Sequence, residues 1–444
     1  MATTYITRTP GSAGNRKTWT LSGWYKRSGH AADYFLSAGQ WSVSQLSQII
    51  FEGDDYLNVA FYSSGSVLEG HLETNRKFRD PAAWYHIVIA MDTTQSVAAN
   101  RLKIYVNGVQ ETSFKTETYP AEDYEPSINN NVAQNIGRRE GSGYFNGNMS
   151  HVQFVDGLAL APTEFGEVDS TSGIWKIKTT AYATPGTNGF FLKMEDRTNL
   201  DLDSSSNALT FTTSGTLTAT YDNPSNNFCT ANPLDNYYAG ITYTNGNTTA
   251  TSSTPYGYSR ATLGVSAGLW YWEVKATTIS APDYVTGVAS AMSTGATIYP
   301  GKNAGSWSYD ATDGTSRNNG SGTAYGNTYS AGDIIGVYLD LTANKLYFAI
   351  NGTVQNSGTG ISITAPASTD DGVYAATAGV WTATTGTVSD FNFGNGYFGT
   401  TAVTSAVADE GGIGAFEYDP SAGTFDSASK DFRAVCTKNI KAYG

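Results

Sequence analysis

A serine in a nucleophile-like pattern is the first candidate for chemistry. Gly264 to Gly268 reads GVSAG and matches the pattern G-x-S-x-G. In a hydrolase this pattern needs a strand before the serine and a helix after it, so that the hydroxyl lies on a strained turn. The residues that follow here, LWYWEVK, have the composition of a strand. The match therefore predicts an ordinary turn.

Paired carboxylates are needed for glycoside hydrolysis, one as the acid and one as the nucleophile. No segment shows the same-face strand pattern Glu-x-Asp-x-x-Glu. The nearest acidic cluster is Glu122, Asp123 and Glu125, which lies between Pro120 and Pro126 in an expected loop. We therefore expect no enzymatic activity.

Metal-binding patterns are weak. The four histidines do not have the spacing of metal ligands: His30, His71, His86 and His151. Asp201-Leu202-Asp203 opens like a calcium-binding loop, but it lacks the glycine and the closing glutamate of an EF-hand. The residues alone predict no cofactor.

Two loops combine aromatic and charged side chains. In TYPAEDYEP, residues 118–126, Tyr119 and Tyr124 flank the carboxylates of Glu122 and Asp123. An exposed tyrosine beside acidic groups can stack on a sugar ring and accept hydrogen bonds from its hydroxyls. An ordinary solvated connection is the competing interpretation. The same two interpretations apply to the loop YDATDGTSR, residues 309–317. Its candidate ligand-binding residues are Tyr309, Asp313 and Arg317.

The elements that would position these loops show a duplication. Residues 100–110 read NRLKIYVNGVQ, and residues 344–355 read NKLYFAINGTVQ. In both copies apolar residues alternate with a period of two, which predicts a strand with one buried face. Asn107-Gly108 and Asn351-Gly352 then supply the two positive-φ residues of a type I′ turn. The chain is predicted to use one hairpin unit twice, in two related domains.

Composition indicates an all-β protein. The 444 residues are too many for one core, and they include 48 Gly, 29 Tyr and 19 Phe. Aromatic and β-branched runs separated by turn-forming residues are typical of many short strands. The best short helical candidate is 161–168.

Charge and the lack of long apolar segments argue against several classes of protein. The formal charge of −13 argues against nucleic-acid and anionic-membrane partners, which need clustered cations. No segment has the length and apolar character of a membrane span or a signal peptide. We expect synthesis in a cytoplasm without a signal peptide.

Composition shifts predict four parts: a first sandwich over 1–222, a linker over 223–236, a second sandwich over 237–398 and a C-terminal segment over 399–444. The phrase Cys-Thr-x-Asn occurs after each sandwich and holds the chain's two cysteines, Cys229 and Cys436. One interpretation is a disulfide. The favoured one is a small buried residue in an equivalent edge segment of each module.

The strand phrases resemble known families. TWTLSGWYKRS, AWYHIVIAMD, NRLKIYVNGVQ and FNGNMSHVQFVDGLALAP resemble a laminin-G/concanavalin-like lectin domain. WYWEVKAT, SWSYD, GDIIGVYLDL and NKLYFAINGTVQ resemble a SPRY domain. The resemblance implies two concanavalin-like antiparallel β-sandwiches of jelly-roll type in tandem. Laminin-G relatives often carry calcium, so the resemblance leaves a calcium site open.

The order of these domains, joined through LKMEDRTNLDLDSSSNALTF, resembles structural proteins of tailed phages, particularly marine ones. It implies a non-enzymatic virion surface protein, such as a tail-fibre or spike tip, that binds host-surface glycan or protein. Other virion proteins and copies of itself would be further partners. The alternatives are a capsid or tail decoration protein and, less favoured, a carbohydrate-active hydrolase.

Overall fold

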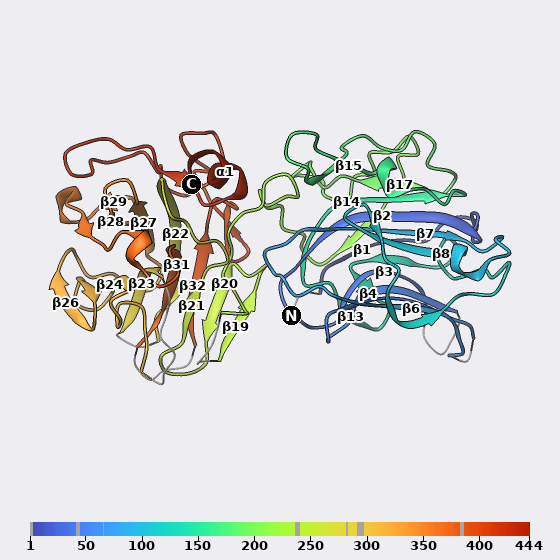
Figure 1. The fold of residues 1–444 in the computed structure, drawn as a ribbon, viewed down its shortest axis with the longest axis horizontal. Helices are drawn as coiled ribbons and strands as arrows, with labels where there is room; N and C mark the ends of the chain where they lie inside the picture. Colours follow the sequence, from blue (N-terminus) through green and yellow to red (C-terminus); the bar gives the residue numbers. More distant parts are fainter. Residues whose placement is uncertain are drawn as a thin grey trace. The chain divides into compact units, whose positions relative to one another are not determined.

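The chain folds into two compact units. The computed structural model describes residues 3–40, 45–64, 66–235, 240–280, 283–290, 297–381 and 386–444. The first unit comprises Met1–Ala219 and the second Thr220–Gly444 (Figure 1). Regular structure in both is almost entirely antiparallel strand, which confirms the all-β prediction.

The first unit is a sandwich of two sheets. The larger sheet has the strand order β10 (Phe114–Thr118), β6 (Leu68–Lys77), β5 (Tyr56–Tyr62), β4 (Leu46–Phe51), β3 (Asp33–Gly39), β11 (Gln134–Ile136), β1 (Tyr5–Arg8), β18 (Thr212–Ser214). The smaller sheet has the order β17 (Phe190–Leu192), β14 (Gly147–Asp156), β2 (Thr18–Arg27), β7 (Tyr85–Asp92), β8 (Leu102–Val106), β9 (Val109–Gln110). Two small hairpins add β12 (Arg138–Arg139) with β13 (Ser142–Tyr144), and β15 (Gly166–Val168) with β16 (Trp175–Ile177).

The second unit is also a two-sheet sandwich. Its larger sheet has the order β19 (Ile241–Thr244), β20 (Thr249–Ser252), β32 (Thr387–Asn392), β22 (Leu269–Thr278), β27 (Ile334–Asp340), β28 (Lys345–Ile350), β29 (Thr353–Val354), with β30 (Ile361–Ser362) beside β28 and β35 (Arg433–Ala434) beside β22. The smaller sheet has the order β21 (Tyr258–Arg260), β31 (Ala375–Val380), β23 (Tyr284–Ala289), β24 (Ser306–Asp310), β25 (Thr315–Asn318), β26 (Ser321–Ala324). A separate pair is formed by β33 (Tyr397–Phe398) and β34 (Thr401–Ala402).

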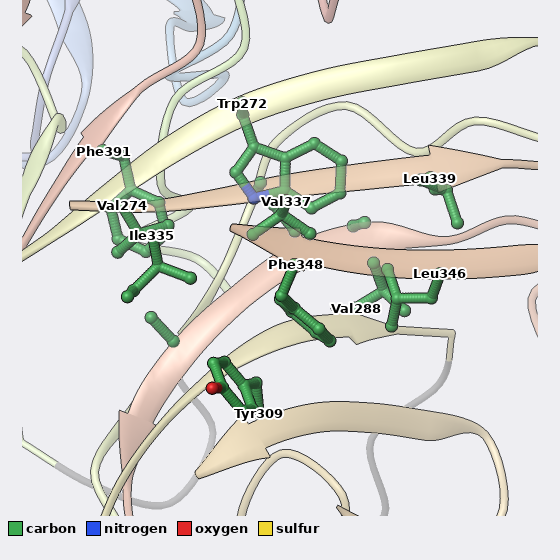
Figure 2. Close-up of a cluster of buried hydrophobic side chains, with 14 of the residues drawn as sticks. Trp272, Val274, Val288, Tyr309, Ile335, Val337, Leu339, Leu346, Phe348 and Phe391 are labelled. Atoms are coloured by element: carbon green, nitrogen blue, oxygen red, sulfur yellow. The ribbon is translucent and has the colours of Figure 1, made fainter. Parts of the chain in front are cut away.

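The core of the second unit follows from alternation along its strands. On β22, Trp272 and Val274 point between the two sheets, where Val337 of β27 and Phe348 of β28 meet them (Figure 2). Residues two apart on a strand share a face. The residues between them therefore lie on the opposite face of the larger sheet.

The duplicated hairpins occupy equivalent places in the two units. The strand order β14–β2–β7–β8–β9 in the first unit corresponds to β32–β22–β27–β28–β29 in the second. Asn107 and Gly108 have φ of 49° and 82°, and Asn351 and Gly352 have φ of 47° and 77°. Both turns join directly paired strand residues, as in type I′ hairpins. The duplication predicted from the sequence is therefore present in the structure as two equivalent hairpins.

A second core lies on the outer face of the larger sheet of the second unit. Residues 404–444, here called the C-terminal strap, and residues 220–235, here called the entry segment, supply its covering side chains. Phe416, Phe425 and Phe432 of the strap pack with Tyr338 and Tyr347 of the sheet. The outer face is thus buried rather than solvated.

The two Cys-Thr-x-Asn phrases pair with each other inside this second unit. Phe228 and Cys436 form an antiparallel bridge, and the backbone N–H of Cys229 donates to the carbonyl of Val435 at 3.0 Å. Cys229 and Val435 face the inner core, whereas Phe228 and Cys436 face the outer one. Both cysteines are buried and are not joined by a disulfide, and the alternation places their side chains in different cores.

The structure departs from the predicted domain limits. The first sandwich was expected to end at 222, and the first unit ends at Ala219. Residues 223–235, expected to be part of a linker, are packed into the second unit, as is the expected C-terminal segment over 399–444. The reason is the burial of Phe228 and Cys229, which the polar composition of the segment concealed. The expected start of the second sandwich, 237, lies outside the described residues.

Helices are short in the described part of the chain. The predicted candidate over 161–168 is a 3-10 turn, Pro162–Glu164, followed by β15. Further 3-10 turns are Ala98–Asn100, Asn356–Gly358 and Pro366–Ser368, and the α-helix α1 spans Thr437–Tyr443. None of the helices in the described ranges is long and apolar enough to cross a membrane.

Candidate functional site

Ion pairs fix the first candidate loop, residues 118–126. Arg101 lies 3.3 Å from Glu122, and Lys17 lies 3.1 Å from Asp123. The Arg16 guanidinium pairs with Glu125 and also donates to two backbone carbonyls of the loop. Glu122 and Asp123 remain more than half exposed. The predicted carboxylates are together and accessible, but each already has a cationic partner.

The two tyrosines of this loop are not free stacking platforms. Both pack against the core of the first unit, and the Tyr124 ring lies 6.2 Å from that of Phe61. Burial raises the pKa of Tyr124 to about 12, and its hydroxyl has no hydrogen-bond partner among the described residues. The Tyr119 hydroxyl donates to Glu117 at 2.7 Å. The geometry supports anchoring of the loop more than sugar stacking.

Tyr309 does not belong to the second candidate loop. It lies on β24, is fully buried, and its ring centroid is 5.2 Å from that of Phe348. Its hydroxyl donates to the carbonyl of Asn327. The alternation of SWSYD turns Trp307 and Tyr309 into the core. The sequence interpretation treated the end of a strand as a loop.

Asp313 and Arg317, in contrast, are brought together at the surface. The Arg317 guanidinium donates to Asp313 at 2.7 Å through Nη2, and to the buried Asp310 at 2.5 Å through Nε. Its Cζ lies 4.7 Å from the centre of the Trp381 ring, and that ring lies 4.9 Å from Tyr299. We call these five residues the Arg317 cluster.

Electrostatics hold the Arg317 cluster in one arrangement. Burial raises the pKa of Asp310, while hydrogen bonds from the Thr312 N–H and from Arg317 act in the opposite direction. A fork-shaped guanidinium held by two carboxylates keeps its plane fixed against the indole. Trp381 is half-buried and Asp313 is 44% exposed. The cluster therefore combines a half-buried indole, held by Arg317 and Tyr299, with an accessible carboxylate.

Sequence reasoning missed Trp381 and Tyr299. They are 82 positions apart by their numbering, and each stands in a stretch without repeated or charged neighbours to single it out. Trp, Tyr and Arg together are the residues that most often dominate binding surfaces. Trp381 could have been chosen as a candidate from its residue type alone. Its contacts with Arg317 and Tyr299 depend on the fold.

A polar row on the outer face of the eight-stranded sheet was also missed. Paired residues cross five neighbouring strands in register, and all but Ala60 are polar: Asn135, Ser37, Gln48, Ala60 and His71. Asn135 Nδ2, Gln48 Oε1 and His71 Nε2 are buried without a hydrogen-bond partner among the described residues. Buried polar atoms normally have partners. A bound water or a ligand hydroxyl would satisfy them.

Two glutamates near this row have interacting charges. Burial and, next, the charge of Glu73 raise the pKa of Glu52. The Asn58 amide donates to Glu52 at 2.8 Å, and Lys115 lies 3.2 Å from Glu73. Glu52 directly follows β4 and Glu73 lies on β6, so sequence spacing could not reveal the pair. Each carboxylate has a structural contact in this arrangement.

The buried Ser22–His86 pair has the wrong polarity for nucleophilic catalysis. The Trp175 indole N–H donates to His86 Nδ1 at 2.9 Å, which makes that nitrogen an acceptor. His86 Nε2 must then carry the proton of the neutral ring and donate to Ser22 Oγ, 2.9 Å away. Burial lowers the pKa of His86 to about 3. The imidazole cannot accept the serine proton in this tautomer.

The remaining predicted motifs are structural. Ser266 lies in an exposed bend that leads directly into β22, which confirms the turn interpretation of GVSAG. Asp203 accepts the backbone N–H groups of Ser205 and Leu209 in its own loop and that of Phe191 on β17. Across the described ranges, no three His, Cys, Asp or Glu side chains are grouped to hold a metal ion.

Comparison with known families gives two matches. The model of the concanavalin A-like lectin/glucanases superfamily matches residues 1–164, and the SPRY domain model matches residues 269–395. No curated protein matches the chain.

Several solved structures match part of the chain at low identity and low TM-score. The SPRY domain of human HERC1 is 20% identical over 36% of this chain and 96% of its own, with a TM-score of 0.31. The TRIM65 PSpry domain is 16% identical over 37% of this chain and 91% of its own, with a TM-score of 0.29. A heptameric SAP-like pentraxin from Limulus polyphemus is 16% identical over 35% of this chain and 71% of its own, with a TM-score of 0.27.

The two family matches agree with the two sandwiches and with the resemblance of their strand phrases. Both kinds of domain are typically binding modules. The chain is thus similar to the concanavalin A-like lectin/glucanases superfamily over residues 1–164 and to the SPRY domain over residues 269–395.

Proposed function

We propose that this chain is a non-enzymatic phage virion surface protein that binds a glycan or protein on the host surface. The phage assignment rests on the resemblance of its domain order to tailed-phage structural proteins. The binding assignment rests on the two binding modules. The observation that most supports the binding assignment is the Arg317 cluster, because it combines a half-buried indole with an accessible carboxylate.

The Arg317 cluster suits a ligand with both an apolar face and polar groups. The half-buried Trp381 indole can stack on the apolar face of a sugar ring or on a side chain. Asp313 can then accept hydrogen bonds from ligand hydroxyl or amide groups. Because Arg317 is already held by Asp310 and Asp313, little side-chain ordering remains to be done on binding.

The test is adhesion of the full chain, displayed in many copies on beads, to host cells. We expect Trp381→Ala and Asp313→Ala to reduce bead binding, because each removes one exposed part of the cluster. Tyr443→Ala removes a 49% exposed aromatic side chain elsewhere in the same unit and serves as the matched control. Equal binding by all variants and the natural chain would contradict a role of the cluster.

A second candidate, a decoration protein that packs against other virion subunits, is favoured by one observation. Val109, Val168 and Ile174 are 63%, 60% and 64% exposed. Val168 pairs with Trp175, and the Gly108 turn lies against the same indole. Contiguous apolar surface often marks a protein interface. Beads that ignore host cells but bind particles lacking this protein would support this candidate instead.

A further inference from the structure

A small cavity opens at one end of the core of the first unit. It has a volume of about 20 Å³, enough for a water-sized group with a mouth to solvent. Its apolar walls include Leu36, Ile136, Phe154, Phe190 and Phe211. The rings of Phe190 and Phe211 meet edge to face at 5.0 Å. The proposed adhesion function does not use this cavity.

Arg8 lines the same cavity from β1. It lies two residues after Ile6, which is buried in the core, so its side chain leaves the strand on the core-facing side. The guanidinium makes no hydrogen bond or ion pair to any residue in the described ranges. Burial lowers the pKa of Arg8, and the charge of Asp203 acts in the opposite direction.

Asp203 is not available as the partner of Arg8. Its two oxygens accept four hydrogen bonds, from the backbone N–H groups of Phe191, Ser205 and Leu209 and from the Ser205 hydroxyl. A half-buried guanidinium carries five donors in a planar fork. Those donors therefore remain to be satisfied by solvent or by a ligand at the cavity.

The other polar groups of the cavity wall are already engaged. The Gln134 amide donates to three backbone carbonyls and accepts from the Asn129 N–H. Asn129 donates to Asp156 at 2.6 Å and accepts from Asn188 at 3.0 Å. The cavity thus offers one cation with free donors above an apolar, aromatic wall.

We propose that the mouth of this cavity binds a carboxylate attached to a short apolar group, with the carboxylate on Arg8 and one methyl-sized group entering the cavity against the phenylalanines. A guanidinium and a carboxylate can form two parallel charge-assisted hydrogen bonds. The apolar wall favours a carbon chain over a hydrated inorganic anion. Two sources share this chemistry: a free short-chain carboxylate and the C-terminal residue of a peptide.

The test is saturation-transfer NMR with the full chain and propionate. Propionamide, which has nearly the same shape and no charge, is the matched ligand control. We expect transfer to the methyl protons of propionate and at least about tenfold weaker binding of propionamide, as loss of a charged hydrogen-bond pair implies. A tripeptide ending in alanine, with a free or an amidated C-terminus, distinguishes a peptide source from a free acid.

Substitution at Arg8 links the binding to this cavity. We expect Arg8→Gln to reduce propionate binding about tenfold or more, Arg8→Lys to retain part of it, and Lys77→Gln, which removes a cation outside the cavity, to leave it unchanged. Equal binding of propionate and propionamide by the natural chain would overturn the proposal even if Arg8→Gln failed to fold. Undiminished propionate binding by a folded Arg8→Gln variant would overturn it as well.

Discussion

At the scale of single residues, the Asn-Gly turns show what local sequence determines. Each asparagine side chain accepts the backbone N–H of the preceding strand, from His86 for Asn107 and from Ile334 for Asn351, both at 2.9 Å. Positive φ and a two-residue connection were predictable because they depend on four consecutive residues. The aromatic rings that cover the turns, Trp175 and Tyr418, come from distant segments and were not predictable.

Substitution of either turn glycine tests this account. A Cβ at Gly108 would lie 2.6 Å from the Trp175 ring, and one at Gly352 would lie 2.6 Å from Tyr418, both at positive φ. We expect Gly108→Val and Gly352→Val each to lower the free energy of unfolding by about 1–3 kcal/mol. Gly11→Val, at a position with open space, is the control in the same thermal melts. Unchanged melting of both turn variants would contradict the hairpin geometry.

Tyr124 gives a second prediction at this scale. Its hydroxyl is buried without a partner among the described residues, while its ring packs near Phe61. We expect Tyr124→Phe to leave the melting temperature unchanged or to raise it, because the unpaired hydroxyl is removed. Tyr124→Ala removes the ring and is expected to cost about 1–3 kcal/mol. Equal destabilisation by both substitutions would show that the hydroxyl has a partner.

Glu273 predicts a pH dependence. It is fully buried and accepts four hydrogen bonds, from the Tyr271 hydroxyl, the Asn392 amide and the backbone N–H groups of Glu417 and Tyr418. Burial raises its pKa from 4.5 to about 7. A raised folded-state pKa contributes stability that is complete below 4.5 and is lost as pH rises through about 7.

Thermal melts across that pH range measure the effect. We expect the melting temperature of the second unit to fall with rising pH in the natural chain, and this slope to be smaller in Glu273→Gln. Glu410→Gln, at an exposed glutamate of the strap, is the control. An identical slope in all three proteins would show that Glu273 stays ionised throughout.

At the scale of elements, the alternation of apolar residues predicted where the strands lie but not which segments pack against them. The period of two correctly marked most long strands, including β22, β27 and β28. It did not show that the outer face of β22 is buried, since Glu273, between Trp272 and Val274, is the residue type expected at a solvated position. The strap that covers it is polar and rich in glycine, and its few phenylalanines are spaced without a period. Such covering segments are specified by distant contacts, which a single sequence does not reveal.

The entry segment provides the test at this scale. Phe228 and Cys229 are buried in the two cores of the second unit. A chain beginning at residue 220 is expected to fold, whereas one beginning at 233 lacks both side chains and the bridge to Cys436. We expect the free energy of unfolding of the chain beginning at 233 to be lower by roughly 3–5 kcal/mol, as for deletion of a large core side chain. Equal denaturant midpoints for the two chains would restore the interpretation of 223–236 as a linker.

At the scale of the whole molecule, the sequence predicted two tandem sandwiches and their type. The repeated hairpin and the strand phrases carried that inference, and the family matches over 1–164 and 269–395 agree with it. Among the candidate site residues, Asp313 and Arg317 form an ion pair, whereas Tyr309 is buried in the core. The Arg317 cluster required the fold, because Trp381 and Tyr299 meet only through the arrangement of separate segments.

The number of copies on one particle determines how strongly such a molecule would adhere. The exposed parts of the Arg317 cluster, chiefly one half-buried indole and one 44% exposed carboxylate, offer little area to a ligand, so a single site is expected to bind weakly. Many copies on one particle would raise the avidity by roughly 10²–10⁴ without new contacts.

We expect the isolated chain to bind host cells poorly in flow cytometry and beads that display many copies to bind strongly. Trp381→Ala beads are expected to lose most of that gain, because avidity multiplies a loss at every site. Strong binding by the isolated chain would contradict the multivalent mechanism, and particles that adsorb normally without this protein would contradict an attachment role.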